Sequence, residues 1–210
     1  MKRGGAGGYI NLCLFRRTCS AFSPTSMASE DFYLHSLLLY NQYPVVPGHC
    51  CPLLWDLRQP PDSARRVLSA DQPITPFHLS RLATNPPTAI LHVTCEVFPG
   101  EWPIEVRRLE GITVGDILGA IHTTLMHPIR RQEWDQLSEK QRSRIKVAFD
   151  ERCKTADDRD ECHSRGILRV DCLLQHTLFA GLYVSLIKDC SCILILRRPP
   201  KFLPANMVET

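Results

Sequence analysis

Apolar and polar positions alternate, and then change period, between residues 90 and 149. On one side of the stretch 90–98 lie Leu91, Val93, Cys95 and Val97, and on the other lie His92, Thr94 and Glu96. A period of two is typical of a strand with one buried face. The turn residues Pro99 and Gly100 follow, and Ile104–Arg107 then alternates again. This stretch therefore predicts an antiparallel β-hairpin.

The period becomes that of a helix after Gly111. Apolar residues fall at intervals of three and four, which predicts an amphipathic helix. The stripe consists of Val114, Ile117, Leu118, Ile121 and Leu125. Thr113 suits the N-cap, with Asp116 three residues on. Pro128 marks the end of the helix, because proline disfavours a helical conformation in the residue before it.

Two further helical segments are expected next. The first carries Trp134 and Leu137 as apolar anchors. The second opens with Ser138 and Gln141, which form a capping box, and it runs to about residue 153. The apolar face of this second segment comprises Ile145, Ala148, Phe149 and Cys153.

Strand patterns flank these helices. The predicted strands are residues 52–58, 167–174, 177–187 and 190–197. Residues 188–189 are expected to form a turn, 62–87 to be irregular, and 154–165 to be a charged connector. Residues 31–43 are too continuously apolar for a clean period and predict a short packed segment.

Together these elements predict one α+β domain over residues 30–198. Its antiparallel sheet would have two to three helices inserted between the hairpin and the C-terminal strands. The order of hairpin, helix and returning strands is similar to a β-grasp core, by analogy alone. Residues 199–210 are expected to be a loose tail.

Residues 1–29 are a separate N-terminal extension, basic and without an acidic residue before Glu30. We expect it to be disordered or targeting-like. A mitochondrial presequence has this composition. The alternative is that Met27 is the working start, since the domain pattern begins just after it. The expected location is the cytoplasm or nucleus, or the mitochondrion if the first 26 residues are translated and act as a presequence.

Composition excludes several classes of protein. The longest apolar run is shorter than the roughly 18–20 residues that a membrane helix requires, so we expect a soluble protein without a membrane partner. A net charge of +3 is too small to indicate nucleic-acid binding, and the basic residues of the helical region alternate with acidic ones. No glycine-rich phosphate loop is present, and we predict no cofactor.

The chain contains ten cysteines and no C-x-x-C motif. A secreted disulfide framework is usually denser, so free and mostly buried thiols in a reducing compartment are favoured. Cys153, Cys162 and His163 could combine with residues 49–51 to bind zinc, but short ligand pairs are missing and we predict no metal site. Cys172 lies between Asp171 and His176, yet a strand would point Asp171 and Cys172 to opposite faces, so a buried thiol is favoured over a nucleophile.

Eight short motifs occur in order along the chain: His35-Ser-Leu-Leu38, Pro52-Leu-Leu-Trp-Asp-Leu-Arg58, Trp102-Pro-Ile-Glu-Val106, Gly111-Ile-Thr-Val-Gly-Asp-Ile-Leu118, Ile121-His122, Arg131-Gln-Glu-Trp134, Gly166-Ile-Leu-Arg-Val-Asp171 and Leu178-Phe-Ala-Gly-Leu182. Their succession resembles an uncharacterised domain of mushroom-forming (basidiomycete) fungi, domain-of-unknown-function family sixty-six ninety-nine. Ser36 and the insertion at 49–51 depart from the pattern. The resemblance implies a shared fold and a fungal source, and it implies no activity.

For function we favour a non-enzymatic protein-interaction module with an unidentified protein partner and an undetermined oligomeric state. Trp102 is the candidate binding residue if any tryptophan is exposed. The alternative is an enzyme or small-molecule-binding domain whose pocket gathers Asp56, Arg58, His122 and Asp171. A cleft that holds several of these four would favour the alternative. An exposed aromatic patch, with the four engaged in structural hydrogen bonds, would favour the module.

Overall fold

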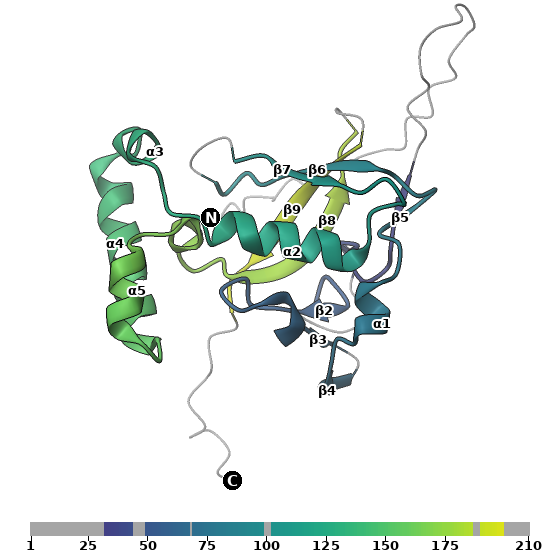
Figure 1. Cartoon of the computed structure of the whole chain (residues 1–210), viewed down its shortest axis with the longest axis horizontal. Coiled ribbons are helices and arrows are strands. Elements are labelled where there is room, and N and C mark those ends of the chain that lie inside the picture. Colours follow the sequence, from purple (N-terminus) through teal and green to yellow (C-terminus); the bar gives the residue numbers. More distant parts are fainter. Residues whose placement is uncertain (1–31, 44–48, 68, 99–101, 187–189, 200–210) are drawn as a thin grey trace, which may run out of the picture.

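A four-stranded sheet forms the centre of the protein in a computed structural model, which describes residues 32–43, 49–67, 69–98, 102–186 and 190–199. The strands are β6 (Ile90–Thr94), β7 (Ile104–Arg107), β8 (Leu178–Val184) and β9 (Ser191–Arg197), in the order β7-β6-β9-β8 (Figure 1). The α+β class is confirmed. The expectation of a purely antiparallel sheet is wrong, because β6 and β9 pair in parallel. Alternation along a strand specifies its buried face but not its neighbour.

The predicted hairpin is present. Leu91 pairs with Val106 and Val93 with Ile104, and all four side chains face the core. The first strand is shorter than expected, because the chain turns after Thr94. The predicted turn residues Pro99 and Gly100 lie outside the described residues.

Helix α2 (Val114–Leu125) lies across one face of the sheet (Figure 1). All five members of its predicted apolar stripe are fully buried. The Asp116 N–H donates to Thr113 Oγ1 at 3.2 Å, and the Thr113 N–H donates to Asp116 Oδ2 at 2.8 Å. The predicted cap is thus a complete capping box, which satisfies N–H groups that the helix itself leaves unpaired.

Three helices form a group at one side of the sheet: α3 (Arg131–Asp135), α4 (Glu139–Thr155) and α5 (Arg159–Arg165) (Figure 1). The Ser138–Gln141 capping box of α4 is confirmed. Helix α5 corrects the expected connector at 154–165. It buries only Cys162, so it has no apolar stripe, and its sequence signals are an N-cap at Asp158 and a left-handed Gly166 at its end.

The predicted strand at 167–174 is wrong. A 3₁₀ helix, η2 (Arg169–Leu173), occupies most of it, and the Asp171 N–H donates to the Leu168 carbonyl at 3.0 Å. The Asp171 carboxylate accepts from the Leu168 N–H at 2.9 Å and closes the turn. A short, continuous apolar run does not distinguish a buried strand from a buried helical turn.

Short elements precede β6, mostly where an irregular segment was expected. They are β1 (Tyr33–Leu34), β2 (Leu53–Leu54), η1 (Pro61–Ser63), β3 (Arg65–Arg66), β4 (Ser69–Pro73), α1 (Pro76–Leu79) and β5 (Thr84–Asn85). Strands β2, β3 and β4 form one small sheet, and β1 pairs with β5. Only two residues of the predicted strand at 52–58 are in a strand, although its alternation holds: Leu53, Trp55 and Leu57 are buried.

Irregular segments cover the outer edge of β8. The Tyr40 N–H donates to the Leu182 carbonyl at 2.9 Å, and the Leu182 N–H donates to the Leu38 carbonyl at 2.7 Å. Gly181 has a φ of +119°, and a Cβ there would lie 2.7 Å from backbone atoms of Tyr40. Glycine therefore permits the close approach that protects this edge.

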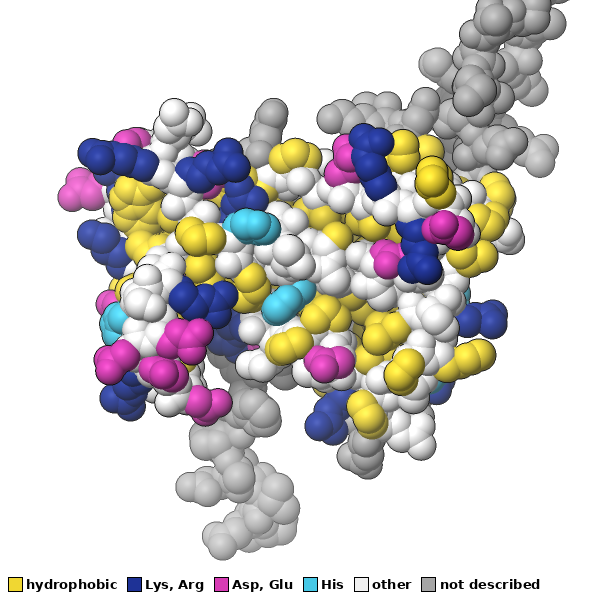
Figure 2. All heavy atoms as spheres, viewed as in Figure 1, with side chains coloured by type: hydrophobic (Ala, Val, Ile, Leu, Met, Phe, Trp, Pro, Cys, Tyr) yellow, Lys and Arg dark blue, Asp and Glu magenta, His cyan; other side chains and the backbone are white. Residues whose placement is uncertain are grey.

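The ordering of hairpin, α2 and returning hairpin is the arrangement on which the β-grasp analogy rests, and the analogy stays a prediction. On the surface, hydrophobic side chains gather toward the α1 and β5 end, whereas charged ones dominate over α4 and α5 (Figure 2). Among the described residues no helix is long and apolar enough to cross a membrane.

Candidate functional site

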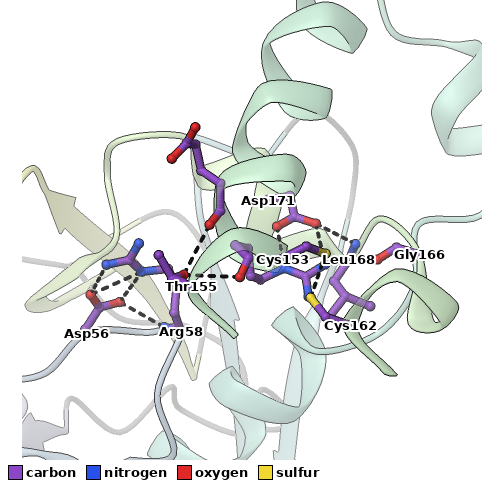
Figure 3. A network of polar contacts seen from close by, with 10 residues as sticks. Asp56, Arg58, Cys153, Thr155, Cys162, Gly166, Leu168 and Asp171 are labelled. Carbon is purple, nitrogen blue, oxygen red and sulfur yellow. Dashed lines mark hydrogen bonds and ion pairs between the residues drawn. The ribbon is translucent and has the colours of Figure 1, made fainter. Parts of the chain in front are cut away.

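Arg152 connects α4 to η2 through a buried ion pair with Asp171 (Figure 3). Its Nε donates to Asp171 Oδ1 at 2.8 Å, and its Nη2 donates to Asp171 Oδ2 at 3.0 Å and to the Gly166 carbonyl at 2.9 Å. The Asp171 side chain is 2% exposed and that of Arg152 is 17% exposed. Burial alone would lower the pKa of Arg152, but Asp171 outweighs burial and raises it, so the guanidinium keeps its positive charge.

Two cysteines extend this network. Cys153 Sγ lies 2.7 Å from Cys162 Sγ, and Arg152 Nη1 donates to Cys162 Sγ at 3.0 Å. Burial, followed by the hydrogen bond to Cys162, raises the pKa of Cys153 to about 11. A thiol with so high a pKa is protonated at neutral pH and is a poor nucleophile. Across the described chain the free cysteines are Cys50, Cys51, Cys95, Cys153, Cys162, Cys172, Cys190 and Cys192.

Asp56 and Arg58 form a second pair nearby (Figure 3). Arg58 Nη2 lies 2.6 Å from Asp56 Oδ2, its Nε lies 3.0 Å from Asp56 Oδ1, and the Arg58 N–H also donates to that oxygen at 3.0 Å. The hydrogen bonds that the Arg58 guanidinium donates to Asp56 raise the pKa of Arg58. The Asp56 carboxylate and the Arg58 guanidinium are thus hydrogen-bonded to each other.

A pocket of about 440 Å³ is lined by residues of α4 and η2, by Arg58 and by residues of the segment that follows η2. Two of the four candidate polar residues, Arg58 and Asp171, line this α4–η2 pocket, and Asp56 contacts it through Arg58. The fourth, His122, does not line it. His122 lies on α2, and burial lowers its pKa, with an opposing effect from Asp62 and a further lowering from Arg165. The structure thus places two of the four at one pocket, and each of these two is already hydrogen-bonded to a carboxylate or guanidinium partner.

Trp102 is buried, with 3% of its surface exposed. Its Nε1 donates to Glu133 Oε1 at 2.9 Å, and the Arg169 guanidinium stacks 4.9 Å from its ring centroid. Arg169 Nη2 also donates to Glu133 Oε1 at 2.8 Å. Trp102 is therefore a core anchor in this conformation and is not available for direct contact with a partner.

The Asp171–Cys172–His176 constellation does not form a nucleophilic site. Burial, followed by the Asp171 charge, raises the pKa of Cys172 to about 12. His176 Nε2 accepts from Arg198 Nε at 3.2 Å. The expected placement of Asp171 and Cys172 on opposite faces of a strand is wrong, because both belong to η2 and both are buried. Over the described residues no group of three His, Cys, Asp or Glu side chains is placed to hold a metal ion.

Exposed aromatic side chains lie instead around α1 and β1. Tyr33 is 73% exposed and Phe77 is 67% exposed, and Leu82 beside them is also exposed. The Arg81 guanidinium carbon lies 5.6 Å from the centroid of the Phe77 ring, a cation–π geometry. We call these four residues, Tyr33, Phe77, Arg81 and Leu82, the α1 surface.

Two hollows adjoin the α1 surface. One, of about 620 Å³, is lined by Tyr33, Leu34, His35, Ser80, Arg81, Leu82, Thr84, Asn85 and Pro87. The other, of about 430 Å³, is lined by His35, Ser36, Leu37, Arg66, Phe77, His78 and Arg81. No carboxylate is among these described lining residues, and no described ion pair engages Arg66 or Arg81. Burial, followed by the charges of Arg81 and His78, lowers the pKa of His35.

Reasoning from the sequence missed the α1 surface and Arg152. Phe77 and Arg81 lie in a proline-punctuated segment without periodicity, so only the tertiary fold shows their exposure. Arg152 is one of several arginines on a charged helix, and the local sequence does not indicate that it meets Asp171, 19 residues away. A long-range ion pair leaves no mark on hydrophobic periodicity.

These features define a small α+β domain with internally engaged polar groups and an exposed aromatic and basic surface. The family model described as "Family of unknown function (DUF6699)" matches residues 53–190, and the chain belongs to that family. The family resemblance is thus confirmed, whereas the fungal source stays a prediction. No curated protein and no solved structure matches the chain.

Proposed function

We propose that this protein is a non-enzymatic protein-interaction module, and that its α1 surface binds an acidic segment of a partner protein that also carries an apolar side chain. The observation that carries the proposal is the combination of two largely exposed aromatic side chains, Tyr33 and Phe77, with two arginines, Arg66 and Arg81, that have no carboxylate partner among the described residues. Aromatic residues and arginine dominate the binding energy of many protein interfaces.

Charge and shape indicate the partner's chemistry. The larger hollow has apolar walls from Tyr33, Leu82 and Pro87, which suit one inserted apolar side chain. Arg81 borders both hollows, and Arg66 borders the smaller one. A carboxylate of the partner, next to the inserted apolar side chain, would therefore meet a guanidinium at either hollow. A basic rim of this kind also accelerates association with an acidic partner.

The state of the polar candidates supports a binding role over an enzymatic one. Asp56, Arg58 and Asp171 are engaged in the two ion pairs described above. Burial raises the pKa of Cys172 to about 12, which opposes a nucleophilic role at neutral pH. General acid–base catalysis requires a group whose proton is free to move near the operating pH.

The test is a tagged pull-down at native expression level, with quantitative mass spectrometry and cross-link mapping. The wild type is compared with Phe77→Glu/Arg81→Glu and with the matched control Val147→Glu, an exposed position on α4. We expect one stoichiometric protein, cross-linked through an acidic segment, that is lost from the double variant and kept by the control. Its binding should weaken as salt rises from 50 to about 300 mM. Equal recovery by all three chains would refute the proposal.

We also propose that the module works in the cytoplasm or nucleus, where reducing conditions keep thiols free. Imaging of the tagged chain with and without residues 1–26 tests this. Identical cytoplasmic or nuclear signals support it. A mitochondrial signal that depends on residues 1–26 would instead support the presequence interpretation.

A further inference from the structure

The α4–η2 pocket has a wall made by one face of a helix. Its members Arg144, Val147, Ala148, Glu151, Arg152 and Thr155 recur at the three- and four-residue intervals that place side chains on one side of α4. The opposite wall includes Val170, Leu174 and Thr177. The pocket therefore has apolar surface on both sides, and its volume of about 440 Å³ falls in the range of small-molecule sites.

One lining residue has an unmet hydrogen-bonding requirement. Thr177 is 4% exposed, and within the described structure its Oγ1 has no hydrogen-bond partner. Buried hydroxyls are normally paired, because an unpaired one gives up its hydrogen bonds to water without compensation. A polar atom of a bound molecule would supply the missing partner.

One charged side chain that lines the pocket has no ion-pair partner among the described residues. Arg58 pairs with Asp56, Arg152 pairs with Asp171, and Glu151 pairs with Lys154. Arg144 is exposed and has no ion pair or hydrogen bond through its side chain in the described part of the chain. A single free guanidinium matches the charge and the planar geometry of one carboxylate. A phosphate dianion would bring a second charge close to Glu151 and Asp171.

We infer that the α4–η2 pocket binds a small organic acid with an apolar body. The carboxylate meets Arg144, the apolar body lies between Val147 and Leu174, and an oxygen of the ligand pairs with Thr177 Oγ1. This site is separate from the α1 surface and does not depend on the proposed interaction module.

The test uses the full chain and three probes that share one apolar body: 4-phenylbutyrate, 4-phenylbutan-1-ol and 4-phenylbutylamine. Binding is followed by amide chemical-shift titration. We expect the acid to bind at least about tenfold more tightly than the alcohol, a ratio typical of one added ionic hydrogen-bonded contact, and the amine to bind most weakly. Shifts should centre on α4 and η2. Equal affinities for acid and amine, or shifts elsewhere, would overturn the inference.

Variants separate the contributions of charge and hydroxyl. Arg144→Gln, at an exposed position, should reduce the affinity for the acid to that for the alcohol. Thr177→Val keeps the side-chain shape, so the fold should be retained with an unchanged or higher Tm. The affinity for an acid probe that carries a second oxygen, 4-(4-hydroxyphenyl)butyrate, should fall about threefold in this variant. Phe77→Glu, on the α1 surface, should change neither value. Unchanged acid affinity in both Arg144→Gln and Thr177→Val would exclude this site.

Discussion

Two regions of the molecule are stabilised in different ways. Helix α2 packs on the central sheet through five fully buried apolar side chains, and the polar groups at its start complete a local cap. The group formed by α4, α5 and η2 instead depends on Arg152, which contacts Asp171, the Gly166 carbonyl and Cys162. In the first region each contact contributes a share of the stability. In the second, one guanidinium holds three segments together.

This difference predicts different responses to mutation. Removing part of an apolar side chain leaves a cavity, whose cost grows with its volume and is limited by local relaxation. Removing one member of a buried ion pair leaves the other member charged and without compensation in a medium that solvates it poorly. The polar region should therefore be the more sensitive to single substitutions, although it contains less apolar surface.

The largest effect is expected for Arg152→Met. The substitution keeps much of the apolar stem but leaves the buried Asp171 carboxylate without its guanidinium, so we expect a loss of about 3–5 kcal/mol in the free energy of unfolding. Urea denaturation at pH 7 measures it.

The double variant Arg152→Met/Asp171→Leu is the control for this prediction. It removes both charges, so it should be less destabilised than Arg152→Met alone, even though the Leu168 N–H loses its acceptor. Additive losses in the two single variants and the double variant would show that the ion pair is not the source of the effect.

Ile117→Ala in α2 should have the next largest effect. Ile117 is fully buried against the sheet, and truncations of this kind cost about 2–5 kcal/mol, depending on how far the site collapses. Denaturation under the same conditions gives the value. A loss larger than that of Arg152→Met would reverse the proposed ranking of the two regions.

The same difference explains how much of the fold the sequence predicts. The α2 stripe and both predicted capping boxes depend on residues within a few helical turns of each other, and each strand of the first hairpin has its own alternation, so periodicity and cap residues are sufficient. Helix α5 has cap residues but no apolar stripe, and η2 coincides with one short apolar run, so hydrophobic periodicity predicts neither element. The apolar run around Val170 and Cys172 is buried as predicted. It forms a 3₁₀ turn and not a strand, because the Asp171 carboxylate accepts from the Leu168 N–H and stabilises the turn.

The sequence predicted less of the candidate site than of the fold. Of the four residues proposed to converge, Arg58 and Asp171 line one pocket, whereas Asp56 and His122 do not line it. Asp56 is linked to the pocket through its ion pair with Arg58. Trp102 is in the core, where its indole N–H donates to Glu133 and the Arg169 guanidinium covers the face of its ring. The exposure of a side chain depends on the assembled fold, so the position of an aromatic residue in a predicted turn does not show that its side chain is accessible.

Thr113→Ala should have a smaller effect, confined to the apolar region. It removes the hydroxyl that accepts from the Asp116 N–H, and loss of such a cap costs about 1 kcal/mol. Ser138→Ala is the matched substitution at the cap of α4. Thermal denaturation of both should give similar reductions in Tm, because capping is local and independent of how each helix is packed. A much larger effect of Ser138→Ala would indicate that the two helices differ at their caps as well.

The smallest effect concerns acid pH and Glu133. Burial alone would raise the pKa of Glu133, but hydrogen bonds from the Arg130 N–H and Trp102, together with Arg169, outweigh burial and hold the pKa below its usual value of 4.5. A carboxyl whose pKa is lowered by folding contributes stability above pH 4.5 and loses it as the pH falls through the lowered value. Urea denaturation at pH 6, 5, 4 and 3 should therefore show a steeper loss for the wild type than for Glu133→Gln, by about 0.5 kcal/mol after allowance for the partly exposed carboxyl.

Asp116→Asn provides the comparison for this last prediction, because the pKa of Asp116 is also lowered. Burial again opposes that shift, and the hydrogen bonds from Thr113 and the nearby Arg108 outweigh it. The Asp116 side chain is 30% exposed and that of Glu133 is 21% exposed, so water screens Asp116 more effectively. Glu133→Gln should thus flatten the acid limb of the stability curve more than Asp116→Asn does. The reverse order would mean that the helix cap, and not the long-range polar contacts, dominates the acid sensitivity of this fold.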